Sequence, residues 1–144
     1  MRYFFEEKSG CSDIQFTAEG TDLTECFTAA WEALVETTAE NADALNACEK
    51  REVRLEEEDL EFLLFDFLQE FVYLKDTEGS IFRIESIELE DAEGFWLLHA
   101  DLYGETLTPE KHGHGADIKA VTLHEFSLKK DPDGLWRARV MLDI

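Results

Sequence analysis

The feature that most constrains the fold is one long segment that is apolar around most of a helical circumference. It covers residues 58–76 and reads EDLEFLLFDFLQEFVYLKD. One stripe at helical spacing consists of Leu60, Leu63, Leu64, Phe67, Leu68 and Phe71. Further apolar surface comes from Phe62, Phe65, Val72 and Tyr73. A helix this apolar must lie inside a core or be covered by a partner. We therefore expect a helix near residues 58–74 that is the more buried of two helices or lies at a contact surface.

A second helix is predicted near residues 22–38. Thr21 or Asp22 stands at its start as the N-cap, and Glu25 supplies the far half of a capping box. Its apolar stripe contains Leu23, Cys26, Phe27, Ala30, Trp31, Leu34 and Val35.

The rest of the chain is typical of strands. Short strand candidates near the start read YFFEE and DIQFTAEG, and a charged, alternating one reads CEKREVRLEEE. A hairpin is indicated by IFRIESIELE and GFWLLHADLYG around the turn EDAEG, and the turn DPDG joins the last two strands, IKAVTLHEFSLKK and LWRARVMLDI. This order predicts an α+β fold in which two main α-helices pack on antiparallel β-sheet. Because the sequence has no linker or repeat, we expect a single domain over residues 1–144.

The charge balance is strongly acidic. The chain has 13 Lys and Arg against 34 Asp and Glu, a formal net charge of −21. Nucleic-acid affinity comes mainly from cations that displace counterions from phosphates, so direct binding of RNA or DNA is not expected. Divalent cations and basic protein surfaces are the partners that such a field attracts. Simple solubility, or an acidic proteome in a salty organism, explains the composition about as well.

The sequence predicts a cytoplasmic setting. It has no apolar stretch of membrane-spanning length, and its first residues, MRYFFEEKSG, lack the apolar region of a signal peptide. The three cysteines, Cys11, Cys26 and Cys48, form no C-x-x-C pair. A disulfide framework or a cysteine zinc site is therefore not expected.

The last strand suggests a place for a cation. Alternation turns one set of side chains inward: Trp136, Ala138, Val140 and Leu142. The other set points away from the core: Arg137, Arg139, Met141 and Asp143. The side chain of Asp143 and the terminal carboxylate of Ile144 then lie one residue apart. Two ordered carboxylates form a plausible half-site for a hard cation, although an acidic chain often places acids in pairs.

Five stretches together resemble the archease family over nearly the whole chain. They are SDIQF, DLTECFTAAWEAL, DLEFLLFDFLQEFVYLKDTEG, GETLTPEKHGHGADIKAVTLHEF and WRARVMLDI. The third is similar to the family's long signature L-L-x-D-x-L-x-E-x-x-[FY]-L-x-D-T-E-G, and the last matches the family's ending almost letter for letter.

The resemblance implies an activator of the RtcB-type RNA ligase of tRNA splicing and RNA repair. Archeases are not ligases; they promote guanylylation of the ligase and its multiple turnover, and they bind a divalent cation, commonly calcium. The family's metal positions fall on Asp13, Asp143 and Ile144, and its activity-linked lysine falls on Lys119. One departure is that Gly10 and Cys11 replace the histidine and threonine of the family's H-T-x-D segment.

Other interpretations stay open from the residues alone. Asp13 could be a turn acid at the start of a strand, and Lys119 an ordinary strand lysine. Asp66, an acid amid aromatic residues, could have a raised pKa or lie at the polar edge of its helix. A small metal-dependent hydrolase that uses Asp13 and Asp143 is the alternative function, and it would require a concave pocket, an open metal position and a general base.

The histidines suggest a weaker alternative. The stretch HGHG carries His112 and His114, with His99 and His124 as possible partners for a transition metal. The glycines are more typical of a mobile loop, and no H-E-x-x-H motif supports zinc.

Overall fold

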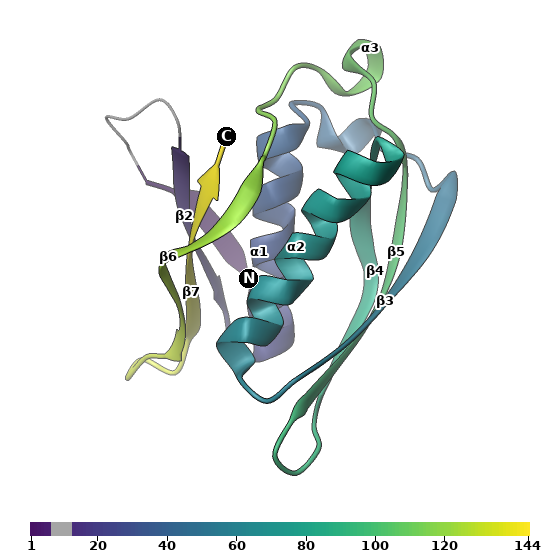
Figure 1. Cartoon of the computed structure of the whole chain (residues 1–144). Helices are drawn as coiled ribbons and strands as arrows, with labels where there is room; N and C mark the ends of the chain where they lie inside the picture. Colours follow the sequence, from purple (N-terminus) through teal and green to yellow (C-terminus); the bar gives the residue numbers. More distant parts are fainter. Residues whose placement is uncertain (7–12) are drawn as a thin grey trace.

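Two antiparallel sheets enclose two long helices in the computed structural model, which describes residues 1–6 and 13–144 (Figure 1). The first sheet has the order β1-β2-β7-β6, from β1 (Arg2–Phe5), β2 (Asp13–Gly20), β7 (Trp136–Asp143) and β6 (Ala120–Lys130). The second has the order β3-β5-β4, from β3 (Glu49–Glu57), β5 (Trp96–Thr106) and β4 (Ser80–Asp91). The long helices are α1 (Leu23–Thr38) and α2 (Leu60–Glu78), and the short ones are η1 (Ala42–Ala44) and α3 (Pro109–His112). The predicted α+β class, with antiparallel sheet and two main helices, is confirmed.

Local capping sets where the two long helices begin and end. Asp22 is the N-cap of α1, and its Oδ1 accepts a hydrogen bond from the backbone N–H of Glu25 at 2.8 Å. The carboxylate of Glu25 accepts in return from the backbone and hydroxyl of Thr21, so both cap candidates take part. The side chain of Asp59 caps α2, which ends at Gly79 in the left-handed region, φ 66°. The last helical residue, Glu78, lies four residues beyond the predicted boundary at residue 74. No helix of the described chain combines the length and apolar character needed to cross a membrane.

Trp31 of α1 lies at the centre of the core. Its ring stacks on Phe67 with centroids 4.6 Å apart and meets the ring of Phe71 edge-on at 5.2 Å. Its indole N–H donates to the backbone oxygen of Phe82 in β4 at 2.8 Å. One side chain therefore joins α1, α2 and the second sheet.

The first of the two alternatives expected for the helix near residues 58–74, that it is the more buried helix, is wrong. Ten of the sixteen residues of α1 are buried, against eight of the nineteen in α2, so α1 is the more buried helix. The reason is position: α1 contacts β1, β2 and β7 of one sheet and β4 of the other. Helix α2 also contacts both sheets, through β6 of the first and β3, β4 and β5 of the second, but it keeps one face outward (Figure 1). Phe62 and Tyr73 on that face are 46% and 59% exposed.

The alternation predicted for the last strand is confirmed at most positions. Ala138, Val140 and Leu142 are buried in the core, while Arg139 and Asp143 are exposed. Three residues depart from it: Trp136 and Arg137 are both half-buried, and Met141 is buried although it lies outside the main core cluster. Its strand is paired on both sides, so neighbouring strands flank Met141.

The loop that carries HGHG is fixed by a buried network. His112 is fully buried, and its Nδ1 accepts from the backbone N–H of Thr108 at 3.0 Å. This leaves its Nε2–H to donate to Glu105 at 3.0 Å. The carboxylate of Glu105 also accepts from Lys111 at 2.7 Å and from the backbone N–H of Asn46 at 2.9 Å. The hydrogen bond from Lys111, helped by the other two donors, lowers the pKa of Glu105 to about 2.

The Trp31→Phe variant should lose the indole hydrogen bond to Phe82 and part of the ring stack. We expect unfolding free energy to fall by about 1–3 kcal/mol, which urea denaturation can measure. Trp96→Phe is the control, since Trp96 is half-buried at the start of β5. Equal midpoints for the two variants would contradict the central position given to Trp31.

The Glu105→Gln variant should change stability in a pH-dependent way. Because the pKa of Glu105 lies below its ordinary value of 4.5, its contribution is present above pH 4.5 and is lost as pH falls toward 2. At pH 7 we expect a loss of about 2 kcal/mol, typical of a hydrogen bond to a charged group. Between pH 4.5 and 2 the gap between parent and variant should narrow in thermal melts. Glu110→Gln, an exposed acid on α3, is the control, and a gap independent of pH would refute the assignment.

Candidate functional site

The pairing of β2 with β7 places Asp13 directly opposite Asp143. Residues directly opposite in an antiparallel pair point to the same face, with Cβ atoms about 4.5–5.5 Å apart. Leu142 is fully buried and the next residue, Asp143, is exposed, so the shared face points away from the core. Two acids distant in sequence therefore meet at one end of the first sheet.

The terminal residue and Lys119 lie at the same end. The side chain of Ile144 packs against the core, which holds its carboxylate within one residue of Asp143. The backbone N–H of Lys119 donates to the backbone oxygen of Asp143 at 2.7 Å, and Ala120 is the register partner of Asp143 on β6. Figure 1 shows the chain end beside β6 and β2. Gly10 and Cys11, the two departures from the family pattern, lie outside the described residues.

The nearest arginines of β7 are paired with other acids. Arg137 donates to Glu19 at 2.5 Å, and Arg139 lies 3.4 Å from Glu6. Within residues 1–6 and 13–144, no Lys or Arg side chain forms an ion pair with Asp13 or Asp143. Like charges directly opposite each other destabilise a sheet, and a cation or a proton relieves that repulsion. An all-oxygen set of two side-chain carboxylates and a terminal carboxylate fits a hard divalent cation such as calcium.

The four histidines do not form a joint site. His112 is buried and donates to Glu105, whereas His114 and His124 are exposed on α3's following loop and on β6. His99 lies on β5 in the second sheet. The transition-metal interpretation of HGHG is therefore wrong. The glycine loop packs on α1 instead, since a Cβ at Gly115 would lie 2.2 Å from the backbone oxygen of Thr38.

Sequence reasoning missed a second group of polar side chains on the outer face of β3 and β5. His99 Nε2 lies 3.0 Å from Glu52 and 3.6 Å from Asp101. Arg54 also donates to Glu52 at 3.0 Å, and hydrogen bonds from Arg54 and His99 lower the pKa of that carboxyl. These side chains are therefore hydrogen-bond partners for one another. The signal that could have located the group is the alternation of charged residues along EKREVRLEE.

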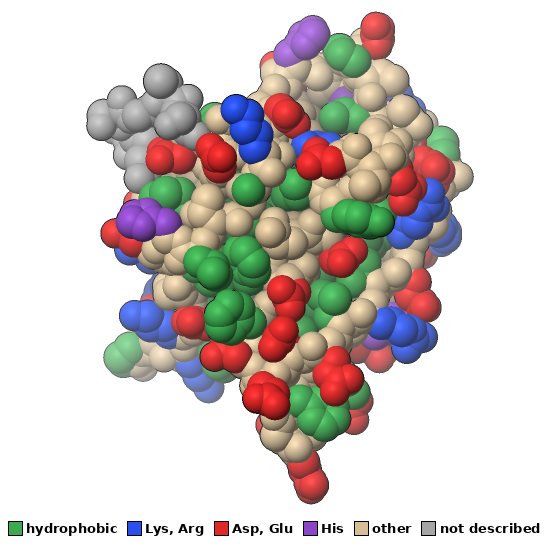
Figure 2. Space-filling model, viewed as in Figure 1, with side chains coloured by type: hydrophobic (Ala, Val, Ile, Leu, Met, Phe, Trp, Pro, Cys, Tyr) green, Lys and Arg blue, Asp and Glu red, His purple; other side chains and the backbone are tan. Residues whose placement is uncertain are grey.

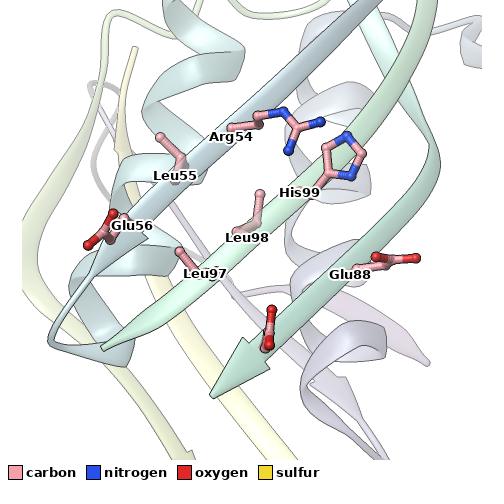
Figure 3. A pocket seen from close by; sticks show the side chains of 8 residues that line it. Arg54, Leu55, Glu56, Glu88, Leu97, Leu98 and His99 are labelled. Atoms are coloured by element: carbon pink, nitrogen blue, oxygen red, sulfur yellow. The ribbon is translucent and has the colours of Figure 1, made fainter. Parts of the chain in front are cut away.

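A shallow hollow borders this group (Figure 3). Its lining consists of Arg54, Leu55, Glu56, Glu88, Glu90, Leu97, Leu98 and His99. Figure 3 shows Arg54 and His99 side by side on neighbouring strands, with Glu88 across from them. All these residues belong to the second sheet, whereas Asp13 and Asp143 belong to the first. The hollow and the paired carboxylates are therefore separate features.

Comparisons with known proteins agree along nearly the whole chain. The model of the "Archease protein family (MTH1598/TM1083)" matches residues 5–144. The protein archease of Pyrococcus abyssi is 39% identical over 140 residues, covering 97% of this chain and 98% of that protein. The archease of Thermococcus kodakarensis is 37% identical with the same coverage.

Solved structures extend the agreement to the fold. The solution structure of Methanobacterium thermoautotrophicum protein 1598 superimposes with a TM-score of 0.83 at 31% identity, covering 99% of this chain and 98% of that one. The crystal structure from Thermotoga maritima described as "an archease, possible chaperone" has a TM-score of 0.65 at 17% identity, covering 96% and 98%, and it supports the fold alone. From the family match and these relatives together, the chain belongs to the archease family.

Proposed function

We propose that this chain is a non-enzymatic activator of an RtcB-type RNA ligase in tRNA splicing and RNA repair. In this role it promotes guanylylation of the ligase and multiple turnover, with a bound divalent cation, calcium, in the cytoplasm. The observation that carries the proposal is the register of β2 against β7. In a chain of the archease family, it brings Asp13 opposite Asp143 beside Lys119 and the packed terminal residue.

The proposed cation ligands are Asp13, Asp143 and the terminal carboxylate of Ile144. A bound divalent cation supplies positive charge that compensates the repulsion among these carboxylates. The strands hold Asp13 and Asp143 in fixed register, and core packing of the Ile144 side chain restrains the third carboxylate. Lys119 is exposed, so its ammonium group is free to contact a partner or to pair with the carboxylates when the cation is absent.

Two observations favour an activator over the alternative hydrolase. A hydrolase that used Asp13 and Asp143 would need a concave pocket, an open metal position and a general base beside them. The hollow of Figure 3 is lined by residues of the other sheet. The net charge of −21 also disfavours direct binding of RNA and favours contact with a basic protein.

The first test measures ligation with the cognate ligase, RNA, GTP and divalent metal. Adding the parent protein should raise guanylylation and turnover, and the protein alone should ligate nothing. Asp143→Asn keeps the side-chain shape but removes a ligand charge, so it should weaken calcium binding about tenfold or more and reduce activation. Asp91→Asn, an exposed acid at the end of β4, is the control. Turnover that does not change when the parent protein is added would exclude the function.

A short extension after Ile144 separates the terminal carboxylate from the other ligands. The extension turns that carboxylate into a peptide group and moves its charge, so calorimetry should show weaker calcium binding. The same short extension placed before Met1, whose side chain is exposed, controls for added length. Calcium binding and activation equal to those of the parent would remove the Ile144 carboxylate from the site.

Lys119→Ala separates cation binding from partner contact. Removing this nearby positive charge should leave calcium affinity unchanged or raise it, while activation of the ligase falls. Lys130→Ala, an exposed lysine at the end of β6, serves as the control. If Lys119→Ala activated the ligase as well as the parent does, the lysine would have no part in the activity.

A further inference from the structure

The outward face of α2 carries two partly exposed aromatic side chains, Phe62 and Tyr73. Phe62, Asp66, Gln69 and Tyr73 recur at spacings of four, three and four residues, so they lie on one side of the helix. Phe62 is 46% exposed and Tyr73 is 59% exposed. At 1.5 Å per residue they lie about 16 Å apart along the helix axis. The two ends of this face are therefore partly open to solvent, whereas Gln69 between them contacts β6.

Contacts with the edge strand β6 fix one side of this face. Phe65 meets Phe126 of β6 edge-on, with centroids 5.7 Å apart. The side chain of Glu61 accepts from the backbone N–H of Leu128 at 3.0 Å, and Gln69 is the acceptor for another N–H of β6. We call Phe62, Phe65, Tyr73 and Phe126 the aromatic strip. These contacts fix the strip residues of α2 and β6 relative to each other. A docking partner therefore loses little free energy to ordering these side chains.

The charged groups beside the strip are acidic. Burial, followed by a hydrogen bond to Glu57 and the charges of Glu57 and Glu70, raises the pKa of Asp66 to about 6. Burial also raises the pKa of Glu70. The single cation of α2, Lys75, has a side chain only 7% exposed and is paired within the protein. Figure 2 shows hydrophobic side chains gathered over β6 and α2, with acidic side chains beside them. A desolvated carboxylate without a cation gains most from a partner that supplies one.

We propose that the aromatic strip docks an apolar, basic segment of a partner protein. Apolar side chains of that segment cover Phe62 and Tyr73, and its Lys or Arg side chains pair with Asp66 and Glu70. A second copy of this chain is a poor occupant, because it would bring the same acids face to face. A nucleic acid is repelled by the same charges. The inference rests on the proposed function to the extent that the partner is the RNA ligase, and it gives that partnership a surface apart from the Asp13 and Asp143 pair.

The test measures binding of the ligase to labelled protein by titration, for the parent and for two variants. One variant alters the aromatic strip and the other alters an acid beside it, and we call both of them the strip variants. Phe62→Ala with Tyr73→Ala removes exposed apolar area, and should weaken binding at least about tenfold by faster dissociation. Glu70→Lys reverses a charge, and should slow association and reduce its dependence on salt. Calcium binding and thermal unfolding should stay near the parent values, since Phe62 and Tyr73 are exposed and the paired carboxylates lie at the sheet end.

Controls of the same type come from other surfaces. Phe4→Ala on β1 removes an aromatic ring that is 43% exposed, and Glu88→Lys reverses an exposed acid on β4. Both should bind the ligase within about twofold of the parent. If the parent protein neither bound nor activated the ligase, the proposed function would fail and take this inference with it. If the parent bound and the strip variants bound equally well, the docking surface alone would be wrong. Self-association of the parent that the strip variants abolish would assign the strip to a second copy and would likewise overturn the inference.

Discussion

The packing of one tryptophan between two helices and a strand is the interaction on which the rest of the structure depends. Trp31 is fully buried, stacks on Phe67 and donates to the backbone of Phe82, so it fixes α1 against α2 and β4 at once. Because α1 contacts both sheets, this junction also sets how far apart the sheets lie. The sheet end that carries Asp13 and Asp143 and the outward face of α2 are both placed by that arrangement.

Local chemistry made much of the fold predictable. Asp22 and Glu25 signalled the start of α1, and alternation along the last strand sorted Val140 and Leu142 from Arg139. What local patterns could not rank was the burial of two helices that are both apolar on one stripe. Both helices contact both sheets, so that ranking depends on how much of each helix surface is covered, and it is settled by packing across the whole chain. The burial of Met141 also depends on packing between distant segments, because β2 and β6 flank it on either side of β7.

Only half of the candidate site was predictable without the resemblance. Alternation along the last strand indicated Asp143 and the terminal carboxylate of Ile144, whereas Asp13 and Lys119 were indicated by the resemblance alone. Nothing in the pattern DIQF fixes its register against VMLD, and a slip of one residue would turn Asp13 to the opposite face from Asp143. The family resemblance points to this pair, and the register of β2 against β7 places the two residues opposite each other. The network of His112 and Glu105 shows the reverse case. Its HGHG spacing resembled a metal motif, but burial and two hydrogen bonds to the ring make that histidine a structural residue.

The hydrogen bonds that side chains of α2 accept from β6 also affect aggregation of the protein at high concentration. As the last strand in the order β1-β2-β7-β6, β6 has one edge that pairs with no other strand of residues 1–6 and 13–144. An open edge offers backbone groups to strands of other molecules and is a common origin of aggregation. Glu61 and Gln69 accept from the N–H groups of Leu128 and Val121 on that edge. These two N–H groups are therefore already bonded and cannot pair with a strand of another molecule. In this way α2 opposes aggregation through the edge of β6.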